Sequence, residues 1–177
     1  MNKKRYPSAA PNDKHWGERP KSIWQSRLRG TLLLLLGRGG WQSRRASLLY
    51  FKDNMVQVYL DNWTLHFQVG VGDEEFQNIE MYEDFDDKAL IAFDVENGGR
   101  GVKTSDLKEL QKQIREELQT NGVYDKLGVD AADPKQHHLL METAPANDVD
   151  FVAKRLVEYM DAVYDVANPV LERMQNE

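Results

Sequence analysis

Apolar residues recur at every second position along short segments between residues 47 and 95, and this pattern constrains the fold more than any other feature. In one segment Leu65, Phe67 and Val69 alternate with polar residues or glycine. A period of two is that of a strand with one buried face. Short turn-like connections such as Asp53-Asn54 favour an antiparallel meander, apolar on one face and wet on the other. We expect five strands, at about 47–52, 56–60, 65–71, 79–81 and 89–95.

Three segments with helical spacing flank these strands and are expected to cover the apolar face of the sheet. In the first, Trp24, Leu28 and Leu32 share a face, and in the last Pro169 should kink or interrupt the helix. Residues 122–135 look irregular, and residues 138–143 fit one further strand. The pattern predicts an α+β fold with a mostly antiparallel sheet and helices at about 22–36, 104–120 and 148–175.

Charge divides the chain into a basic first quarter and an acidic remainder. Residues 1–45 hold 11 Lys or Arg and two acids, whereas residues 46–177 hold 12 basic and 27 acidic residues. Residues 1–20 contain prolines and charges without apolar periodicity, which predicts a flexible basic arm before a single domain over residues 21–177. Such an asymmetry bears on the partners of a protein rather than on its fold.

The basic first quarter is the first candidate binding region. Trp24 and Trp41 are among the aromatic residues interleaved with its cations, as stacking platforms for bases would be. The alternatives are that these cations dock on the acidic surface of the same chain, of a second copy in a homo-oligomer, or of another protein. The candidate residues for nucleic acid or a protein partner are Lys3, Lys4, Arg5, Arg27, Arg29, Arg38, Arg44 and Arg45.

Acidic residues are concentrated between Asp73 and Asp87, where eight acids occur before the first cation at Lys88. Such a run is either a solvated edge of the sheet or a docking surface for a basic partner, as in an inhibitor or immunity-type protein. The residues that would form this acidic docking edge are Glu83, Asp84, Asp86 and Asp87.

Asp94 and Glu96 are the acids that we compare with the site of a metal-dependent nuclease, since Asp86-Asp87-Lys88 has the nuclease spacing but looks like a turn rather than a strand. They lie two apart, so they share a face of the strand, and paired carboxylates bind divalent ions. The lysine that restriction-type nucleases carry two residues further on is Gly98 here. The four histidines show no chelating spacing, and His66 is expected as a polar histidine on a strand. We therefore assign no catalytic residue, cofactor or metal, and keep Asp94 and Glu96 as an alternative metal pair.

The chain has no cysteine, and its longest apolar run, the leucines at 32–36, is too short to cross a bilayer. Disulfides and thiolate metal sites are excluded, and a reducing compartment is the simplest expectation. We therefore expect a cytoplasmic protein that is not bound to a membrane.

The apolar spacing from Arg155 to Met174, with its single proline, resembles the closing helix of an uncharacterised C-terminal domain of restriction-type phage-defence nuclease proteins. The resemblance covers roughly the last 75 residues and implies an accessory or recognition module in a bacterial or phage-related setting. The expected function is a non-enzymatic binding module for nucleic acid or a protein. The alternatives are the inhibitor or immunity-type protein and a divergent metal-dependent nuclease.

Overall fold

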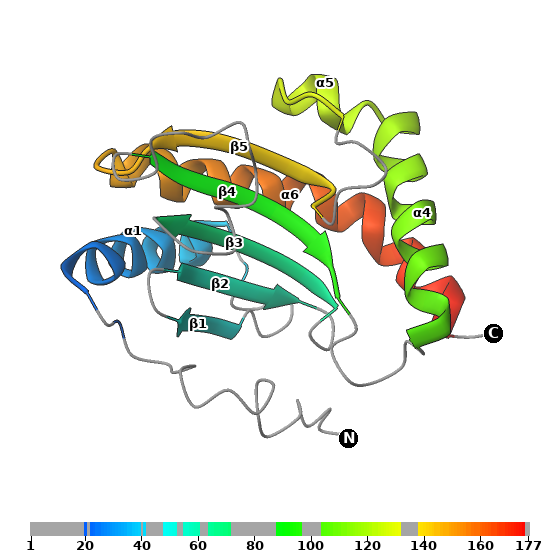
Figure 1. Cartoon of the computed structure of the whole chain (residues 1–177), viewed down its shortest axis with the longest axis horizontal. Coiled ribbons are helices and arrows are strands. Elements are labelled where there is room, and N and C mark those ends of the chain that lie inside the picture. Colours follow the sequence, from blue (N-terminus) through cyan, green and yellow to red (C-terminus); the bar gives the residue numbers. More distant parts are fainter. Residues whose placement is uncertain are drawn as a thin grey trace.

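The computed structural model has an α+β architecture in which one antiparallel sheet is covered by helices on one face (Figure 1). The strands are β1 (Leu48–Lys52), β2 (Met55–Leu60), β3 (Leu65–Val71), β4 (Lys88–Val95) and β5 (Leu140–Pro145). The helices are α1 (Ile23–Arg38), α4 (Thr104–Thr120), α5 (Val123–Leu127) and α6 (Val149–Gln175). The structure describes residues 20, 22–39, 41, 48–52, 55–60, 64–71, 88–96, 104–131 and 138–175.

The strand order follows the chain, β1-β2-β3-β4-β5, with every neighbouring pair antiparallel. Four of the strands predicted between residues 47 and 95 are present. The strand expected at 79–81 lies outside the described residues, and β3 pairs directly with β4, so no strand separates these two in the sheet. The segment expected as a further strand supplies β5 at the other edge, after α4 and α5.

One face of the sheet forms the main hydrophobic core with the helices. Phe67 and Phe93 stack across β3 and β4 with their ring centroids 4.8 Å apart. Helices α1 and α6 pack on each other, and α6 also contacts β3, β4 and β5. The inner face predicted for α6 is confirmed, because Val152, Leu156 and Met160 are all buried. Helix α6 continues through Pro169 to Gln175, so the expected interruption is not found.

The helix boundaries agree closely with the expectation, apart from one short addition. Helix α1 begins after Ser22, whose hydroxyl accepts a hydrogen bond from the Gln25 backbone N–H at 3.1 Å. Gly122 ends the turn after α4 with a φ of 67°, a conformation that favours glycine. The segment predicted to be irregular contains α5. This helix has only five residues, which is too short for a periodic pattern in the sequence.

The second face of the sheet is buried as well, which contradicts the prediction of a wet face. Gln57, His66, Gln68 and Asp94 lie on this face and are all less than 5% exposed. Period-two alternation identifies the polar side chains correctly. It does not show whether they are in contact with water, because polar side chains that hydrogen-bond to one another can be buried at low cost.

Candidate metal centre

The pairing of β3 with β4 brings three titratable side chains together on the second face of the sheet. His66 of β3 is the direct cross-strand neighbour of Asp94 of β4. Side chains directly opposite each other on antiparallel strands have their Cβ atoms about 4.5–5.5 Å apart. Glu96 lies two residues beyond Asp94 and therefore on the same side of the chain. The three come from two adjacent strands, although up to 30 residues separate them in sequence.

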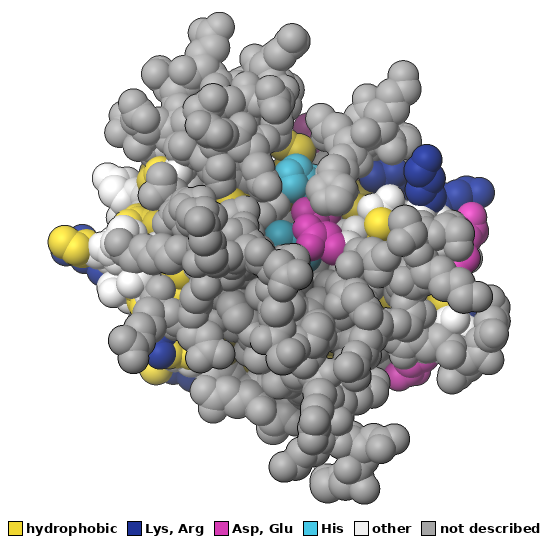
Figure 2. Space-filling model, turned by 60° about the horizontal axis from the view of Figure 1, so that its bottom comes forward, with side chains coloured by type: hydrophobic (Ala, Val, Ile, Leu, Met, Phe, Trp, Pro, Cys, Tyr) yellow, Lys and Arg dark blue, Asp and Glu magenta, His cyan; other side chains and the backbone are white. Residues whose placement is uncertain are grey.

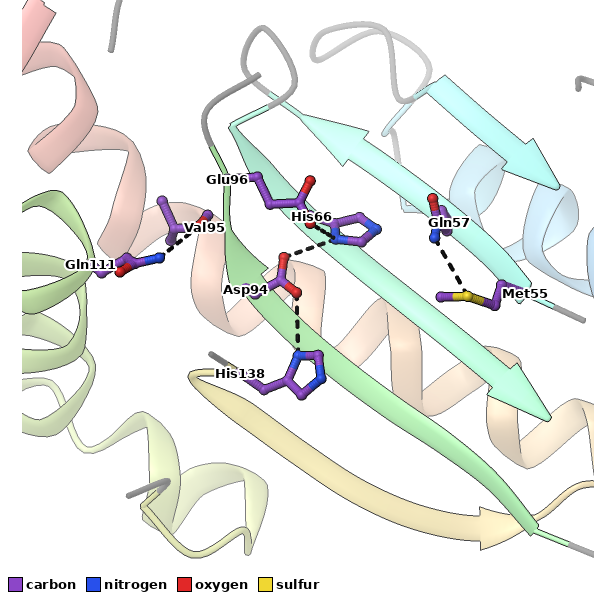
Figure 3. Close-up of polar contacts among 8 residues, drawn as sticks. All are labelled: Met55, Gln57, His66, Asp94, Val95, Glu96, Gln111 and His138. Atoms are coloured by element: carbon purple, nitrogen blue, oxygen red, sulfur yellow. Dashed lines mark hydrogen bonds and ion pairs between the residues drawn. The ribbon is translucent and has the colours of Figure 1, made fainter. Parts of the chain in front are cut away.

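The side chains converge on one ring nitrogen (Figure 3). The Nδ1 atom of His66 lies 2.8 Å from Oδ1 of Asp94 and 3.0 Å from Oε1 of Glu96. The second oxygen of Asp94, Oδ2, lies 3.2 Å from Nδ1 of His138, the residue two before β5. Two histidines therefore contact different oxygens of the same carboxylate.

The electrostatic environment of this cluster is strongly negative. Burial by itself disfavours the charged ring of His66, but the charges and hydrogen bonds of Asp94 and Glu96 outweigh it and raise the pKa of His66 to about 10. The same negative potential that holds a proton on an imidazole attracts a metal cation to the same place. A bound cation would replace that proton, because imidazole coordinates metals in its neutral form.

The geometry of His66, Asp94 and Glu96 is suited to a single metal ion. One ligand atom of each lies within 4.8 Å of the others, so a central ion can reach all three. One imidazole and two carboxylates are donors of mixed N and O type, which suits Mn²⁺, Fe²⁺, Co²⁺ or Zn²⁺ better than Ca²⁺. Three protein ligands leave at least one coordination position, as in catalytic rather than structural metal sites.

The cluster is closed at its base and open at one side. Asp94 is 1% exposed and His66 is 3% exposed, whereas the side chain of Glu96 is 35% exposed. Figure 2 shows histidine and acidic side chains next to one another in the middle of one face of the molecule. A ligand from solvent would therefore approach from the Glu96 side.

Gln68 extends the polar row on this face, two residues from His66 along β3. Its Oε1 atom is buried and accepts no hydrogen bond from the residues that the structure describes. A buried acceptor of this kind costs free energy unless a water molecule or a ligand serves it. Gln68 is therefore a further polar group for whatever binds at the cluster.

The structure places the sequence-predicted residues in different regions. Asp94 and Glu96 do lie on one side of the chain, and both contact Nδ1 of His66. Three of the predicted cations, Arg27, Arg29 and Arg38, are exposed on α1. Helix α1 lies against the helix-covered face, so these cations are separated from the cluster by the sheet (Figure 1). The others lie outside the described residues: Lys3, Lys4, Arg5, Arg44, Arg45, Glu83, Asp84, Asp86 and Asp87.

The two tryptophans proposed as stacking platforms have structural roles instead. Trp41 is buried, donates from Nε1 to Oδ1 of Asp161 at 2.9 Å, and packs its ring edge-on to Tyr164. Trp24 is partly buried and donates from Nε1 to the Ala146 carbonyl oxygen at 2.9 Å. Both rings attach the N-terminal segment to α6 and its preceding turn, and the burial of Trp41 prevents it from stacking on a base.

Sequence reasoning missed His66 and His138 as members of the site. The one available signal is that His66 falls on the polar side of its strand, as Asp94 does, but this does not show that the two strands pair. A strand at 79–81 would separate His66 from Asp94 in a meander, so the predicted strand order did not place them side by side. His138 reaches Asp94 through the β4–β5 pairing, which joins segments more than 40 residues apart in sequence.

Comparisons with protein-family models, curated proteins and solved structures gave no significant match to this chain. Among the helices that the structure describes, none is long and apolar enough to span a membrane.

Proposed function

We propose that this chain binds one divalent metal ion through His66, Asp94 and Glu96 and uses it to hydrolyse a phosphodiester bond. The observation that carries the proposal is the convergence of one imidazole and two carboxylates within 4.8 Å. This proposal develops the metal-dependent nuclease alternative and changes its ligand set, because a histidine from the neighbouring strand completes the pair. A divalent ion held there by His66, Asp94 and Glu96 would lower the pKa of a bound water molecule toward neutral pH.

The open side of the cluster supports hydrolysis rather than a purely structural metal. Glu96 is partly exposed, whereas Asp94 and His66 are buried. A substrate could therefore reach a bound metal ion from the side of Glu96. Helix α4 borders this place, since Gln111 donates from Nε2 to the Val95 carbonyl oxygen at 3.0 Å (Figure 3). Lys108, one turn earlier on α4, is exposed, and Figure 2 shows Lys and Arg side chains beside the acidic cluster. Cations beside a metal site favour a phosphate substrate.

Metal binding is tested by calorimetric titration of the full chain with Mn²⁺ and Zn²⁺ after treatment with EDTA. We expect one ion per chain, with affinity at least tenfold weaker in each of His66→Ala, Asp94→Asn and Glu96→Gln. Glu109→Gln on the exposed side of α4 is the matched control and should bind as the wild type does. Equal affinity in all the variants would exclude this site.

Catalysis is tested with bis(p-nitrophenyl) phosphate and with labelled single-stranded and duplex DNA in the presence of Mn²⁺. We expect cleavage that EDTA abolishes and that Asp94→Asn lowers by at least a hundredfold. A protein that binds the metal ion at this cluster but cleaves neither probe would keep the metal site and reject the phosphodiesterase.

The solvent-exposed face of helix α1 supports a second proposed function, the binding of nucleic acid. Arg27, Arg29 and Arg38 are all exposed, and residues 23–38 contain no acid. Ile23 is 75% exposed and Leu34 is 54% exposed on the same side as Arg27 and Arg38. Exposed arginines on a helix without acids of its own fit phosphates, although Asp150 of α6 contacts α1 at Thr31.

Fluorescence anisotropy with a labelled duplex tests this second function. Three phosphate contacts predict a log-log salt slope of about −2.7, and Arg27→Glu with Arg38→Glu should reduce affinity by more than tenfold. Arg173→Glu, an exposed charge reversal in the last turn of α6, is the control. Binding that is absent at low salt, or unchanged in the double variant, would reject the role of α1. An acidic protein partner would then be the remaining expectation for its arginines.

A further inference from the structure

His138 lies on the opposite side of Asp94 from His66 and is not one of the three groups that converge on a single point. Its Nδ1 atom is 3.2 Å from Oδ2 of Asp94, whereas Nδ1 of His66 is 2.8 Å from Oδ1. Figure 3 shows the Asp94 carboxylate between the two rings. One oxygen of Asp94 therefore faces the metal ligands, and the other faces His138.

The contact with His138 determines which oxygen of Asp94 is available to an ion. Nδ1 of His138 lies at ion-pair distance from Oδ2, and the two atoms are not aligned as a hydrogen bond. The ring nevertheless stands against Oδ2 at 3.2 Å and obstructs the approach of an ion to that oxygen, whereas Oδ1 faces His66. Monodentate coordination by Asp94 keeps a position open for water, which a bidentate carboxylate would fill.

The backbone next to His138 is held by hydrogen bonds to two other elements. The Leu139 N–H donates to the Phe93 carbonyl oxygen at 2.8 Å, and the Leu139 carbonyl oxygen accepts from the Tyr124 hydroxyl at 3.1 Å. Burial raises the pKa of Tyr124, so the hydroxyl keeps the proton it donates. The residue that follows His138 is thereby hydrogen-bonded to β4 and to α5.

We infer that His138 is a positioning residue that holds Asp94 in monodentate coordination of a divalent metal ion. The inference rests on the proposed metal site and adds a fourth side chain to it. Side chains that contact metal ligands from outside the coordination sphere typically change metal affinity or activity by 10- to 100-fold. His138 would act on the ion through Asp94, without coordinating the ion itself.

The test compares His138→Leu, which removes the polar ring atoms, with His138→Asn, whose amide nitrogen can take the place of Nδ1. Co²⁺ is the probe, because its visible absorption reports coordination number and its titration gives affinity. We expect His138→Leu to weaken Co²⁺ binding by 10- to 100-fold and to change the absorption bands. His138→Asn should restore the wild-type bands and an affinity within about threefold of the wild type. Urea unfolding of the metal-free variants shows whether each is folded.

The outcomes separate this inference from the proposal beneath it. Wild-type affinity and bands in His138→Leu would overturn the role of His138 while leaving the metal site intact. Loss of binding in both His138 variants would make His138 a ligand and overturn its positioning role. Absence of Co²⁺ binding in the wild-type protein would overturn both proposals. If His138→Leu does not fold, Tyr124→Phe provides the second variant, and unchanged affinity and bands there would contradict the positioning by Leu139.

Discussion

Asp94 is the residue on which the arrangement of the second sheet face depends. It is 1% exposed, and an ionised carboxylate at such a position is costly unless charged or polar partners compensate it. His66 and His138 contact its two oxygens from neighbouring strands. The metal-free protein therefore places at least one positive imidazole beside the carboxylate, where a metal ion would otherwise provide the charge.

Stability should depend on pH through His66, with a sign set by its raised pKa. The folded protein keeps the His66 proton up to a pKa of about 10, whereas the unfolded chain loses it near 6.5. The stabilisation is therefore complete below about pH 6.5 and is lost as pH rises through 10. Between these two pKa values, the contribution of His66 to the free energy of unfolding should fall by about 1.4 kcal/mol for each unit by which the pH rises.

This dependence is measured by urea unfolding between pH 7 and pH 9 with EDTA present. The difference in slope between the wild type and His66→Gln isolates this one histidine from the other titrating groups. Parallel pH profiles for the two proteins would contradict the prediction.

Helix α1 shows at the scale of an element how one apolar run divides between core and solvent. The five consecutive leucines at 32–36 look alike in sequence, but Leu32 is fully buried and Leu34 is 54% exposed. We expect Leu32→Ala to lower the free energy of unfolding by about 2–5 kcal/mol because it leaves a cavity. Leu34→Ala should change it by less than about 0.5 kcal/mol. Denaturant unfolding of both variants checks this, and equal losses would show that the two faces of α1 are assigned wrongly.

Arg155 of α6 connects its own helix to β5 and α5. Its guanidinium pairs with Glu142 of β5 and Glu158 of α6, and it donates to the Leu127 carbonyl oxygen at the end of α5. We expect Arg155→Met to cost roughly 2–4 kcal/mol, since it leaves a half-buried carboxylate and a carbonyl without their donor. The neighbouring Lys154→Met is the control, because Lys154 is 71% exposed and its pair should contribute less than about 0.5 kcal/mol. A loss in Lys154→Met as large as in Arg155→Met would contradict this role.

Most elements could be predicted because their signals are local. Period-two alternation located β2, β3 and β4, and helical spacing located α1, α4 and α6 within one or two residues. Which strands pair is not local information. The expected strand at 79–81 was placed between β3 and β4, which pair directly. The continuity of α6 through Pro169 depends on the packing of Val170 and Leu171, which a local rule about proline does not include.

At the scale of the whole molecule, the sheet separates two surfaces with different chemistry. Helix α1 with its arginines lies on the helix-covered side of the sheet (Figure 1), and the cluster of His66, Asp94 and Glu96 lies on the opposite face (Figure 3). The sequence pointed to two of these three proposed ligands, because Asp94 and Glu96 are close in the chain. It did not point to His66 or His138, since both depend on strand pairing across long connections. A site assembled from β3, the end of β4 and the residue two before β5 exists only in the folded chain.

Because the proposed ligands come together only on folding, metal binding should stabilise the whole protein. An ion that binds only the folded state adds about 2.7 kcal/mol at a free concentration one hundred times its Kd. For a chain of 177 residues this corresponds to a rise in Tm of roughly 5–10 °C. Thermal unfolding with and without Mn²⁺ measures the shift, and Asp94→Asn should abolish it while Glu109→Gln keeps it. A shift of the same size in Asp94→Asn would mean that the ion acts elsewhere on the chain.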